Sequence, residues 1–327
     1  MFALTIADDL TGAAEVAAAL VRAVGAPRRV VLGRRALRGG DVAVLPTRRS
    51  KPERACRAAA GLALPERGIV FVKIDSTLRG PWVELVDTLA ARLRAQPLIA
   101  PAFPARGRTV AGGIALVDGA PLFAGPFARE IPGAEEGLSL AGLIARRAPA
   151  LRAEVPDAVT DRDLDAVARE MLSAGRRLVV GSAGLAEAFA RVLGTSTGYV
   201  PLAAAPRARG PVAVAAGSRA AATARQVALL GERAAVLRGR GLRILARAAL
   251  EAAADGTLVA CGGETALQIL YALRVRGMTV YGEIAPAVVL ARPLGSDLTL
   301  LTKSGSLGAD DALLAALEAL DLASRRA

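Results

Sequence analysis

Residues 3–12 read ALTIADDLTG, an apolar run that ends in two adjacent aspartates, Asp8 and Asp9. No basic segment precedes the apolar run, so we interpret it as the first core strand of a domain and not as a signal peptide. A segment with helical period follows at 13–24. A strand that leads through a polar turn into a helix is the unit from which parallel sheets are built.

The same alternation of strand and helix patterns continues along the chain. Short apolar runs predict strands at 3–7, 29–32, 42–45, 69–74, 98–100, 178–180, 212–215, 258–261 and 298–301. Segments of helical period predict helices at 13–24, 52–62, 82–95, 161–174, 183–193, 220–230, 242–254, 265–275 and 310–323. Asp118-Gly119 predicts a hairpin turn within the Gly/Pro-rich region 101–133. The pattern therefore predicts an α/β protein whose mostly parallel sheets carry helices on both faces.

The length of 327 residues favours two domains, because a typical domain has roughly 150 residues. Residues 199–210 have no clear period, contain Pro201, Pro206 and Gly210, and precede a new apolar strand. We therefore predict a larger domain at 1–205 and a smaller one at 206–327.

The composition excludes several kinds of active site. The chain contains no histidine, which removes Ser-His-Asp and Cys-His catalysis as well as HExxH zinc sites. Its cysteines, Cys56 and Cys261, are too few for a disulfide framework and predict a reducing, cytoplasmic location. The longest charge-free stretch, 192–206, is shorter than the about 20 apolar residues of a membrane span. We expect no membrane partner.

A net charge of +12 raises the question of nucleic-acid binding. The arginines are scattered, and an aromatic content of 3% leaves few platforms for stacked bases. An RNA-binding protein is therefore the weaker alternative, and we expect an anionic small molecule as the partner. The lysines, Lys51, Lys73 and Lys303, are few in a chain that otherwise uses arginine.

Two junctions after predicted strands carry charged side chains. Asp8 and Asp9 could hold hydroxyl groups, accept a proton or bind Mg²⁺, although Asp9 could equally cap the following helix. Residues 73–80 read KIDSTLRG. In this segment Lys73 supplies a compact ammonium group and Asp75 could accept a proton. Arg79 could bind a carboxylate through two parallel hydrogen bonds. An ordinary capped loop with an ion pair is the alternative interpretation.

Other junctions consist of small residues. They are Gly181-Ser182-Ala183-Gly184, Gly217-Ser218, Gly262-Gly263-Glu264-Thr265 and Lys303-Ser304-Gly305-Ser306-Leu307-Gly308. Such turns expose backbone N–H groups to phosphate, and each alone is equally typical of a tight turn. None is a Walker A loop, because the chain contains no Gly-Lys pair. Their concentration after residue 205 favours a nucleotide-binding domain there.

The motifs IADDLTG, KIDSTLRG, PAFPARGRTVAGG, GSAGLAEA, GGET and KSGSLG follow one another in this order along nearly the whole chain. Together they make the chain similar to the four-carbon acid sugar kinases. The resemblance implies an ATP-dependent kinase that phosphorylates the terminal hydroxyl of threonate, erythronate or an oxo-tetronate. It also implies that 1–205 binds the sugar acid and 206–327 the nucleotide, with the active site in the cleft between the domains.

The resemblance also assigns roles to residues by motif. Substrate binding falls to Asp8, Asp9, Arg48, Lys73, Asp75, Ser76 and Arg79. Nucleotide binding falls to Ser218, Gly262, Gly263, Glu264, Thr265, Lys303 and Gly305. Asp8, Asp9, Asp75 and Lys73 are the candidate catalytic residues, and the residues leave open which aspartate accepts the proton. We expect Arg79, with Arg48, to pair with the substrate carboxylate and Lys73 to neutralise developing charge.

The expected cofactors are ATP and Mg²⁺, with the metal ion bridging the phosphates of ATP. The sequence does not identify which residues would bind this ion. We also expect a homodimer. Two departures from the family pattern, Ala220 in place of a hydroxyl residue and Leu307 in place of a phenylalanine, keep an alternative open. In that alternative the chain is a catalytically weakened relative that binds and senses a sugar acid or a nucleotide.

Overall fold

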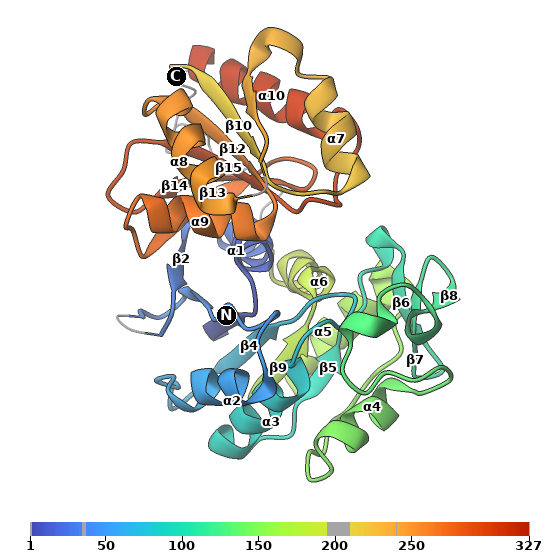
Figure 1. Ribbon diagram of the computed structural model, residues 1–327. Helices are drawn as coiled ribbons and strands as arrows, with labels where there is room; N and C mark the ends of the chain where they lie inside the picture. The colour runs from blue at the N-terminus through green and yellow to red at the C-terminus, as the bar shows by residue number, and fades with distance from the viewer. Residues whose placement is uncertain (1, 35–36, 195–209, 240, 327) are drawn as a thin grey trace. The chain divides into compact units, whose positions relative to one another are not determined.

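The structure is a computed structural model that describes residues 2–34, 37–194, 210–239 and 241–326 (Figure 1). Its chain forms two compact units, the first from Met1–Val16 and Leu32–Thr195 and the second from Ala17–Val31 and Ser196–Ala327. The passage from the first unit to the second therefore falls inside helix α1, Leu10–Val24. The domain boundary that the sequence predicts between residues 205 and 206 lies outside the described residues.

The first unit is built on a parallel sheet. Its strands lie in the order β3, β1, β4, β9, β5, and every neighbouring pair is parallel. They are β1 Phe2–Ala7, β3 Val42–Val44, β4 Ile69–Lys73, β5 Leu98–Ala100 and β9 Leu178–Gly181. Their apolar runs are buried almost throughout, as expected of parallel strands that are covered on both faces.

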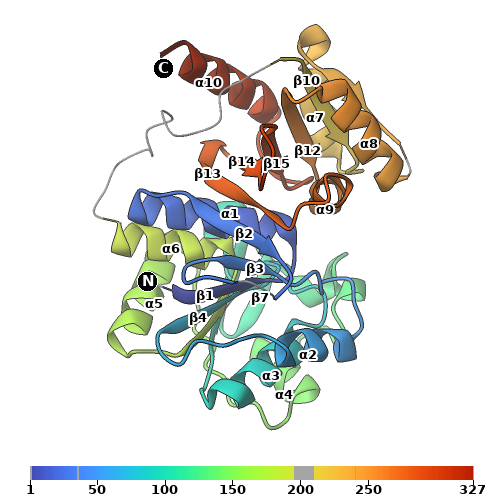
Figure 2. The same cartoon turned by 90° about the vertical axis from the view of Figure 1, so that its left-hand side faces the viewer.

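Helices cover both faces of this sheet. Helix α2, Pro52–Ala60, packs against α3, Trp82–Leu93, and α5, Asp161–Ser173, packs against α6, Ala183–Leu193. Figure 2 shows the first pair on one side of the sheet and the second pair on the other. An aromatic cluster of Phe2, Phe71 and Phe189 fills the core of this unit, with Phe2 and Phe71 stacked at 4.8 Å between ring centroids.

Residues 104–147 form a smaller layer in the first unit. Strands β6 (Arg108–Ala111), β7 (Ile114–Val117) and β8 (Ala120–Pro121) make an antiparallel sheet. The predicted turn at Asp118-Gly119 is confirmed, since both residues have positive φ, 50° and 82°, as a two-residue hairpin turn requires. Helix α4 (Leu140–Arg147) was not predicted, because its eight residues are too few to establish a helical period.

The second unit is likewise built on parallel strands, which lie in the order β11, β10, β12, β15. They are β10 Val212–Ala216, β11 Ala235–Leu237, β12 Thr257–Cys261 and β15 Thr299–Lys303. Helices α7 (Ala221–Ala228) and α10 (Ala312–Arg326) contact each other, and so do α8 (Leu242–Ala253) and α9 (Gly263–Ala272). The predicted α/β class is confirmed in both units.

An antiparallel segment extends this second sheet. Strands β14 (Val288–Pro293), β13 (Gly277–Ala285) and β2 (Arg28–Leu32) follow β15 in that order. The sequence did not predict β13 and β14, because two register shifts interrupt their pairing and Gly282 has a φ of 138°. Such irregularities remove the strict alternation that identifies a strand in the sequence.

Among the helices of the described ranges, none combines the length and the apolar character that a membrane crossing requires.

Candidate active site

The segments that the sequence predicts to carry chemistry lie at comparable points of the two sheets. In open parallel sheets, ligands bind beyond the carboxyl ends of the strands, at the point where the strand order reverses direction. In the first unit this point lies between β1 and β4, since β3 flanks β1 on the other side. In the second unit it lies between β10 and β12, since β11 flanks β10 on the other side.

In the first unit the six charged residues predicted to bind substrate come together. We call them the charged cluster: Asp8, Asp9, Arg48, Lys73, Asp75 and Arg79. They lie at or just after the carboxyl ends of β1, β3 and β4, which are neighbours in the sheet. Ala7 pairs with both Val44 and Lys73. Ser76, the remaining residue predicted to bind substrate, lies half-buried in the loop after β4.

Asp9 is the cap of helix α1. Its Oδ1 accepts a hydrogen bond from Gly12 N at 2.7 Å, and its Oδ2 accepts one from Thr11 Oγ1 at 3.1 Å. Arg48 Nη1 also forms an ion pair with Asp9 Oδ2. The carboxylate is therefore engaged on both oxygens, as the capping interpretation predicts.

Asp8 has the opposite environment. Its backbone is held by hydrogen bonds, since Asp8 N donates to Lys73 O at 3.4 Å and Asp8 O accepts from Thr47 N at 3.2 Å. Both carboxylate oxygens are buried, and neither has a hydrogen-bond partner among the described residues. Burial and the neighbouring charge of Asp9 raise the pKa of Asp8 to about 7, although Lys73 and Arg48 act in the other direction. This carboxyl can therefore gain or lose a proton near neutral pH.

The ammonium of Lys73 lies against the first turn of α1. A Cβ added to Gly12 would be 2.6 Å from both Lys73 Nζ and Asp9 Oδ1, so any larger residue would displace these two side chains. Lys73 is buried, and its Nζ donates to Ile74 O at 3.0 Å. The glycine of the ADDLTG motif therefore makes room for a buried cation beside the aspartates.

Asp75 is saturated with donors. Arg79 donates to it from Nε at 2.6 Å and from Nη2 at 3.0 Å, and Thr77 Oγ1 donates at 2.5 Å. Arg48 Nη1 lies 3.9 Å from Asp75 Oδ1. Although burial raises the pKa of Asp75, these hydrogen bonds and positive charges outweigh it and hold the pKa well below its usual range. The remaining nitrogen of Arg79, Nη1, lies 3.8 Å from the exposed Glu130.

Close packing positions the loop that carries Asp75 and Arg79. Gly80 has a φ of 85°, and a Cβ there would lie 2.4 Å from Arg48 O. Leu78 is fully buried with a φ of 59°, a conformation that a leucine adopts only when its surroundings hold it. The loop after β4 therefore packs closely against the backbone of the segment that carries Arg48.

In the second unit the small-residue turns predicted to bind nucleotide also meet. We call them the glycine turns: Gly217-Ser218, Gly262 to Thr265, and Ser304-Gly305. Ser218 N donates to Cys261 O at 3.1 Å, and Gly262 N donates to Lys303 O at 2.8 Å. A Cβ on Gly305 would lie 2.0 Å from Ser218 Oγ, and one on Gly217 would lie 2.2 Å from Thr265 Oγ1. Helix α9 begins here without a side-chain cap, which leaves the N–H groups of its first turn for a ligand.

Lys303 organises one of these turns from inside. The side chain is buried, and its Nζ donates to the carbonyls of Ser304 at 2.7 Å and Leu307 at 2.9 Å. Gln226 Nε2 donates to Gly308 O at 3.0 Å in the same loop. The ammonium of Lys303 thus holds the backbone carbonyls of its own loop.

The Gly181 to Gly184 turn has a packing role in the structure. Ser182 Oγ donates to Ala102 O at 2.7 Å, and it accepts from Gly184 N at 3.0 Å as the cap of α6. A Cβ on Gly184 would lie 2.7 Å from Ala102 O. These contacts explain the small residues of this motif without a ligand.

The structure adds residues that the sequence analysis missed. Glu15 lies one turn beyond Gly12 on α1, and burial raises its pKa to about 7, an effect that Lys73 opposes. Thr77 binds Asp75, and Gln226 holds the loop after Lys303. Thr77 lies within the KIDSTLRG motif and could have been found there, whereas Glu15 and Gln226 lie outside every motif.

Comparisons with known proteins match both units. Residues 3–132 match the family model of a sugar-binding N-terminal domain, and residues 232–313 match that of a nucleotide-binding C-terminal domain. D-threonate kinase of Bordetella bronchiseptica is 30% identical over 96% of this chain and 96% of its own length. D-threonate kinase of Cupriavidus necator is 30% identical over 97% of each chain. A crystal structure of a Salmonella typhimurium LT2 protein shares the fold, with a TM-score of 0.73 at 21% identity, covering 96% of this chain and 98% of that one.

Proposed function

The chain belongs to the four-carbon acid sugar kinase family, and from this premise we propose that it transfers the γ-phosphoryl group of ATP to the terminal hydroxyl of a four-carbon sugar acid. D-threonate, the substrate named for the relatives, is the first candidate. One observation carries the proposal: the charged cluster occupies the ligand position of the unit that matches a sugar-binding domain, and the glycine turns occupy that of the unit that matches a nucleotide-binding domain.

The charged cluster offers what a sugar acid needs. Its guanidinium and ammonium groups can neutralise a carboxylate, and its aspartates can accept hydrogen bonds from hydroxyl groups. Asp75 holds Arg79 by two nitrogens, which leaves Nη1 directed away from Asp75. In the proposal, Asp75 orients Arg79, and Arg79 with Arg48 binds the carboxylate of the substrate.

We assign the proton acceptor to Asp8. A general base works best when its pKa lies near the working pH, and the pKa of Asp8 is about 7. Its two buried oxygens have no partner in the described part of the chain, so a substrate hydroxyl could supply one. Asp75 is a poor base, because its pKa is held low and its oxygens are already bonded. Asp9 caps α1 and positions the pair.

The glycine turns would bind the phosphates of the nucleotide. Backbone N–H groups at the start of α9, with the Ser218 hydroxyl, suit phosphate oxygens. Lys303 keeps the Ser304-Gly305 turn in place through its hydrogen bonds to backbone carbonyls. Lys73 in the first unit would balance the charge that develops during transfer, since phosphoryl transfer depends mainly on positioning and electrostatics.

Magnesium belongs to the proposal as a companion of the triphosphate. In the described residues no group of three acidic or cysteine side chains gathers that could hold a metal alone, which fits an ion bound mainly through phosphate oxygens. Glu264 and Ser218, both in the glycine turns, offer the oxygen ligands that such an ion accepts. When bound, the ion would neutralise phosphate charge.

An ATP-consumption screen over the stereoisomers of threonate and erythronate and over oxo-tetronates tests the proposal. We expect turnover that requires both ATP and one of these acids. Absence of ATP consumption with every acid would contradict it. In that case stabilisation of the fold by a sugar acid without an effect of Mg-ATP would favour the sensor alternative.

A further inference from the structure

We infer that Thr223 and Gln226 of helix α7 are positioning residues for phosphate binding, because they hold the carbonyl groups of the loop at 304–309 and so turn N–H groups of this loop toward a ligand. The inference rests on the proposed function and deepens it, since this loop contains one of the glycine turns. Thr223 and Gln226 lie three positions apart on α7 and therefore share one face of the helix. The sequence motifs assign neither of them to the nucleotide.

Both side chains are buried and donate hydrogen bonds to the loop. Thr223 Oγ1 donates to Gly305 O at 2.7 Å. Gln226 Nε2 donates to the carbonyls of residues 307–309, at distances of 3.0, 3.0 and 2.8 Å. The loop is therefore held by its carbonyl groups against a single helix.

The buried ammonium of Lys303 shares two of these carbonyls with α7. Lys303 Nζ donates to Gly305 O at 3.4 Å and to Leu307 O at 2.9 Å. Each of these oxygens thus accepts from Lys303 and from a side chain of α7, which uses both of its lone pairs. Lys303 and α7 therefore act together on the same carbonyl groups.

The held carbonyls determine where the N–H groups of the loop point. The peptide bonds of the described chain are trans, and in a planar trans peptide the N–H points opposite to the C=O. Because Ser304 O faces Lys303 and Gly305 O faces Thr223, the N–H groups of Gly305 and Ser306 point away from these donors. Among the described residues neither N–H group has a hydrogen-bond partner. Successive N–H groups of this kind suit phosphate oxygens.

The amide of Gln226 shows that its nitrogen, and not only its size, matters at this position. Its Oε1 is buried and has no hydrogen-bond partner in the part of the chain that the structure describes. An unpaired buried polar atom lowers stability, so an apolar side chain of similar size would serve better if packing were the only requirement. We therefore ascribe the role of Gln226 to the hydrogen bonds that its Nε2 donates to the loop.

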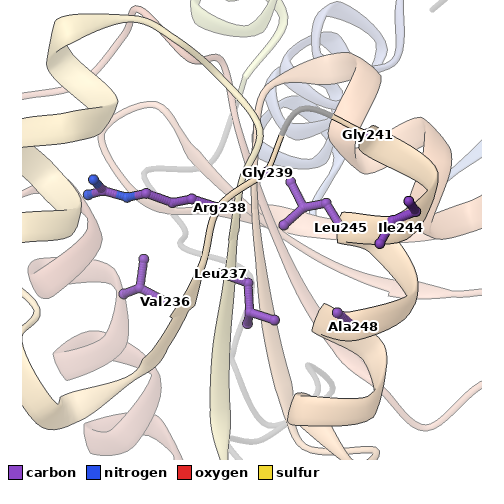
Figure 3. Close-up of a pocket in the computed structure, with 8 residues that line it drawn as sticks. All are labelled: Val236, Leu237, Arg238, Gly239, Gly241, Ile244, Leu245 and Ala248. Carbon is purple, nitrogen blue, oxygen red and sulfur yellow. The ribbon is translucent and has the colours of Figure 1, made fainter.

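The choice of ligand decides what a binding experiment reports. A cavity of about 450 Å³ lies between β11 and α8 of the same unit, and its lining comes from residues 236–248, which excludes α7 and the loop (Figure 3). A whole nucleotide can contact surfaces of this kind in addition to the loop, so its affinity does not isolate the phosphate contacts. Inorganic tripolyphosphate carries the phosphates alone and is therefore the probe.

Substitutions on α7 test the inference in the full chain. Thr223→Val removes the hydroxyl with little change in size, and Gln226→Leu removes the amide. We expect each to raise the Kd for tripolyphosphate in calorimetry and the KM for ATP at least fivefold, with the KM for the sugar acid within twofold of the parent. Thr223→Ser keeps the hydroxyl and should bind tripolyphosphate within twofold of the parent.

An ion pair beside these contacts provides the matched control. Arg225 Nε donates to Asp310 Oδ1 at 2.8 Å, and both side chains are exposed. This pair also joins α7 to the segment that follows Lys303, but it does not involve the loop carbonyls. Asp310→Asn breaks the pair and should leave the Kd for tripolyphosphate within twofold.

The outcomes separate this inference from the proposed function. If the parent binds tripolyphosphate and both α7 variants bind it within twofold of the parent, the inference is wrong and the kinase proposal stands. An equal rise in the KM for ATP and for the sugar acid would show a general structural role and would also overturn the inference. If Gln226→Leu does not fold, Thr223→Val with its Thr223→Ser rescue decides. Failure of the unsubstituted protein to bind ATP, ADP or tripolyphosphate would overturn both proposals.

Discussion

Replacing Asp8 by asparagine removes the one carboxylate of the charged cluster whose oxygens have no partner among the described residues. The amide has nearly the same shape, so the fold should persist. We expect the variant to lose turnover by about 10²- to 10⁴-fold, the usual contribution of a general base. We also expect it to be more stable than the parent protein at alkaline pH, which is unusual for a change in an active site.

The expected gain follows from the pKa of Asp8. Folding raises this pKa from 3.8 to about 7, and at about 1.4 kcal/mol per tenfold change in proton affinity the difference is on the order of 4 kcal/mol. A raised pKa means that the folded protein binds the proton more tightly. The stability linked to this proton is complete below pH 3.8 and is lost as the pH rises through about 7. Because the buried amide also lacks partners, a gain of about 1–3 kcal/mol at pH 8 is the realistic expectation.

Urea unfolding from pH 5 to pH 9 measures this difference. The stability of Asp8→Asn relative to the parent should increase with pH and level off above pH 8. Asp9→Asn is the matched control: its amide oxygen can still cap α1 through Gly12 N, but it loses the charge that pairs with Arg48. It should therefore destabilise the protein by about 1–3 kcal/mol, the contribution of a hydrogen bond to a charged group.

Two results would refute the reasoning about Asp8. One is a stability difference between Asp8→Asn and the parent that does not change with pH. The other is turnover of Asp8→Asn within tenfold of the parent, because a general base cannot be dispensable.

Three further substitutions test other contacts. Asp75→Asn should lower the free energy of unfolding by about 3–5 kcal/mol at pH 7, because it leaves Arg79 without its carboxylate partner. The difference from the parent should shrink as the pH falls below 4, because the parent's own carboxylate then begins to be protonated. An equal difference at all pH values in urea unfolding would contradict the ion pair. Gly12→Ala should destabilise by about 1–3 kcal/mol despite the better helix propensity of alanine, so a gain in melting temperature would argue against the close contact. Gly305→Ala would place a Cβ 2.0 Å from Ser218 Oγ and should raise the KM for ATP at least tenfold with an unchanged KM for the sugar acid; equal changes in both would point to a general loss of structure.

Much of the fold could be predicted because its strands are short, continuous apolar runs. The run before Asp8 became β1, and the run before Gly262 became β12. The hairpin of β13 and β14 could not be predicted, because bulges and Gly282 disturb its alternation. Nor does the sequence show that residues 17–31 belong to the second unit, since that depends on the distant pairing of β2 with β13.

The sequence was sufficient to predict which residues form the charged cluster, but not which of them caps a helix, orients an arginine or accepts a proton. Asp8 and Asp9 are the same residue type at adjacent positions, and the sequence could not choose between them. The difference arises because Gly12, Thr11 and Arg48 all donate to Asp9, and Arg48 comes from the end of another strand. Asp75 is a poor base because Arg79, four residues further on, donates two hydrogen bonds to its carboxylate. The sequence separation alone does not show this contact, because it depends on the conformation of the loop that joins the two residues.

The pairing of β2 with β13 has a practical consequence for anyone who wishes to express the nucleotide-binding half by itself. A truncated gene that starts beyond residue 209 would omit Arg28–Leu32 and leave the backbone N–H and C=O groups of Gly277–Val280 without their β2 partner strand. An unpaired strand edge can form hydrogen bonds with a strand of another molecule, so such a fragment should aggregate. Grafting the missing segment back through a short linker should restore a well-behaved product.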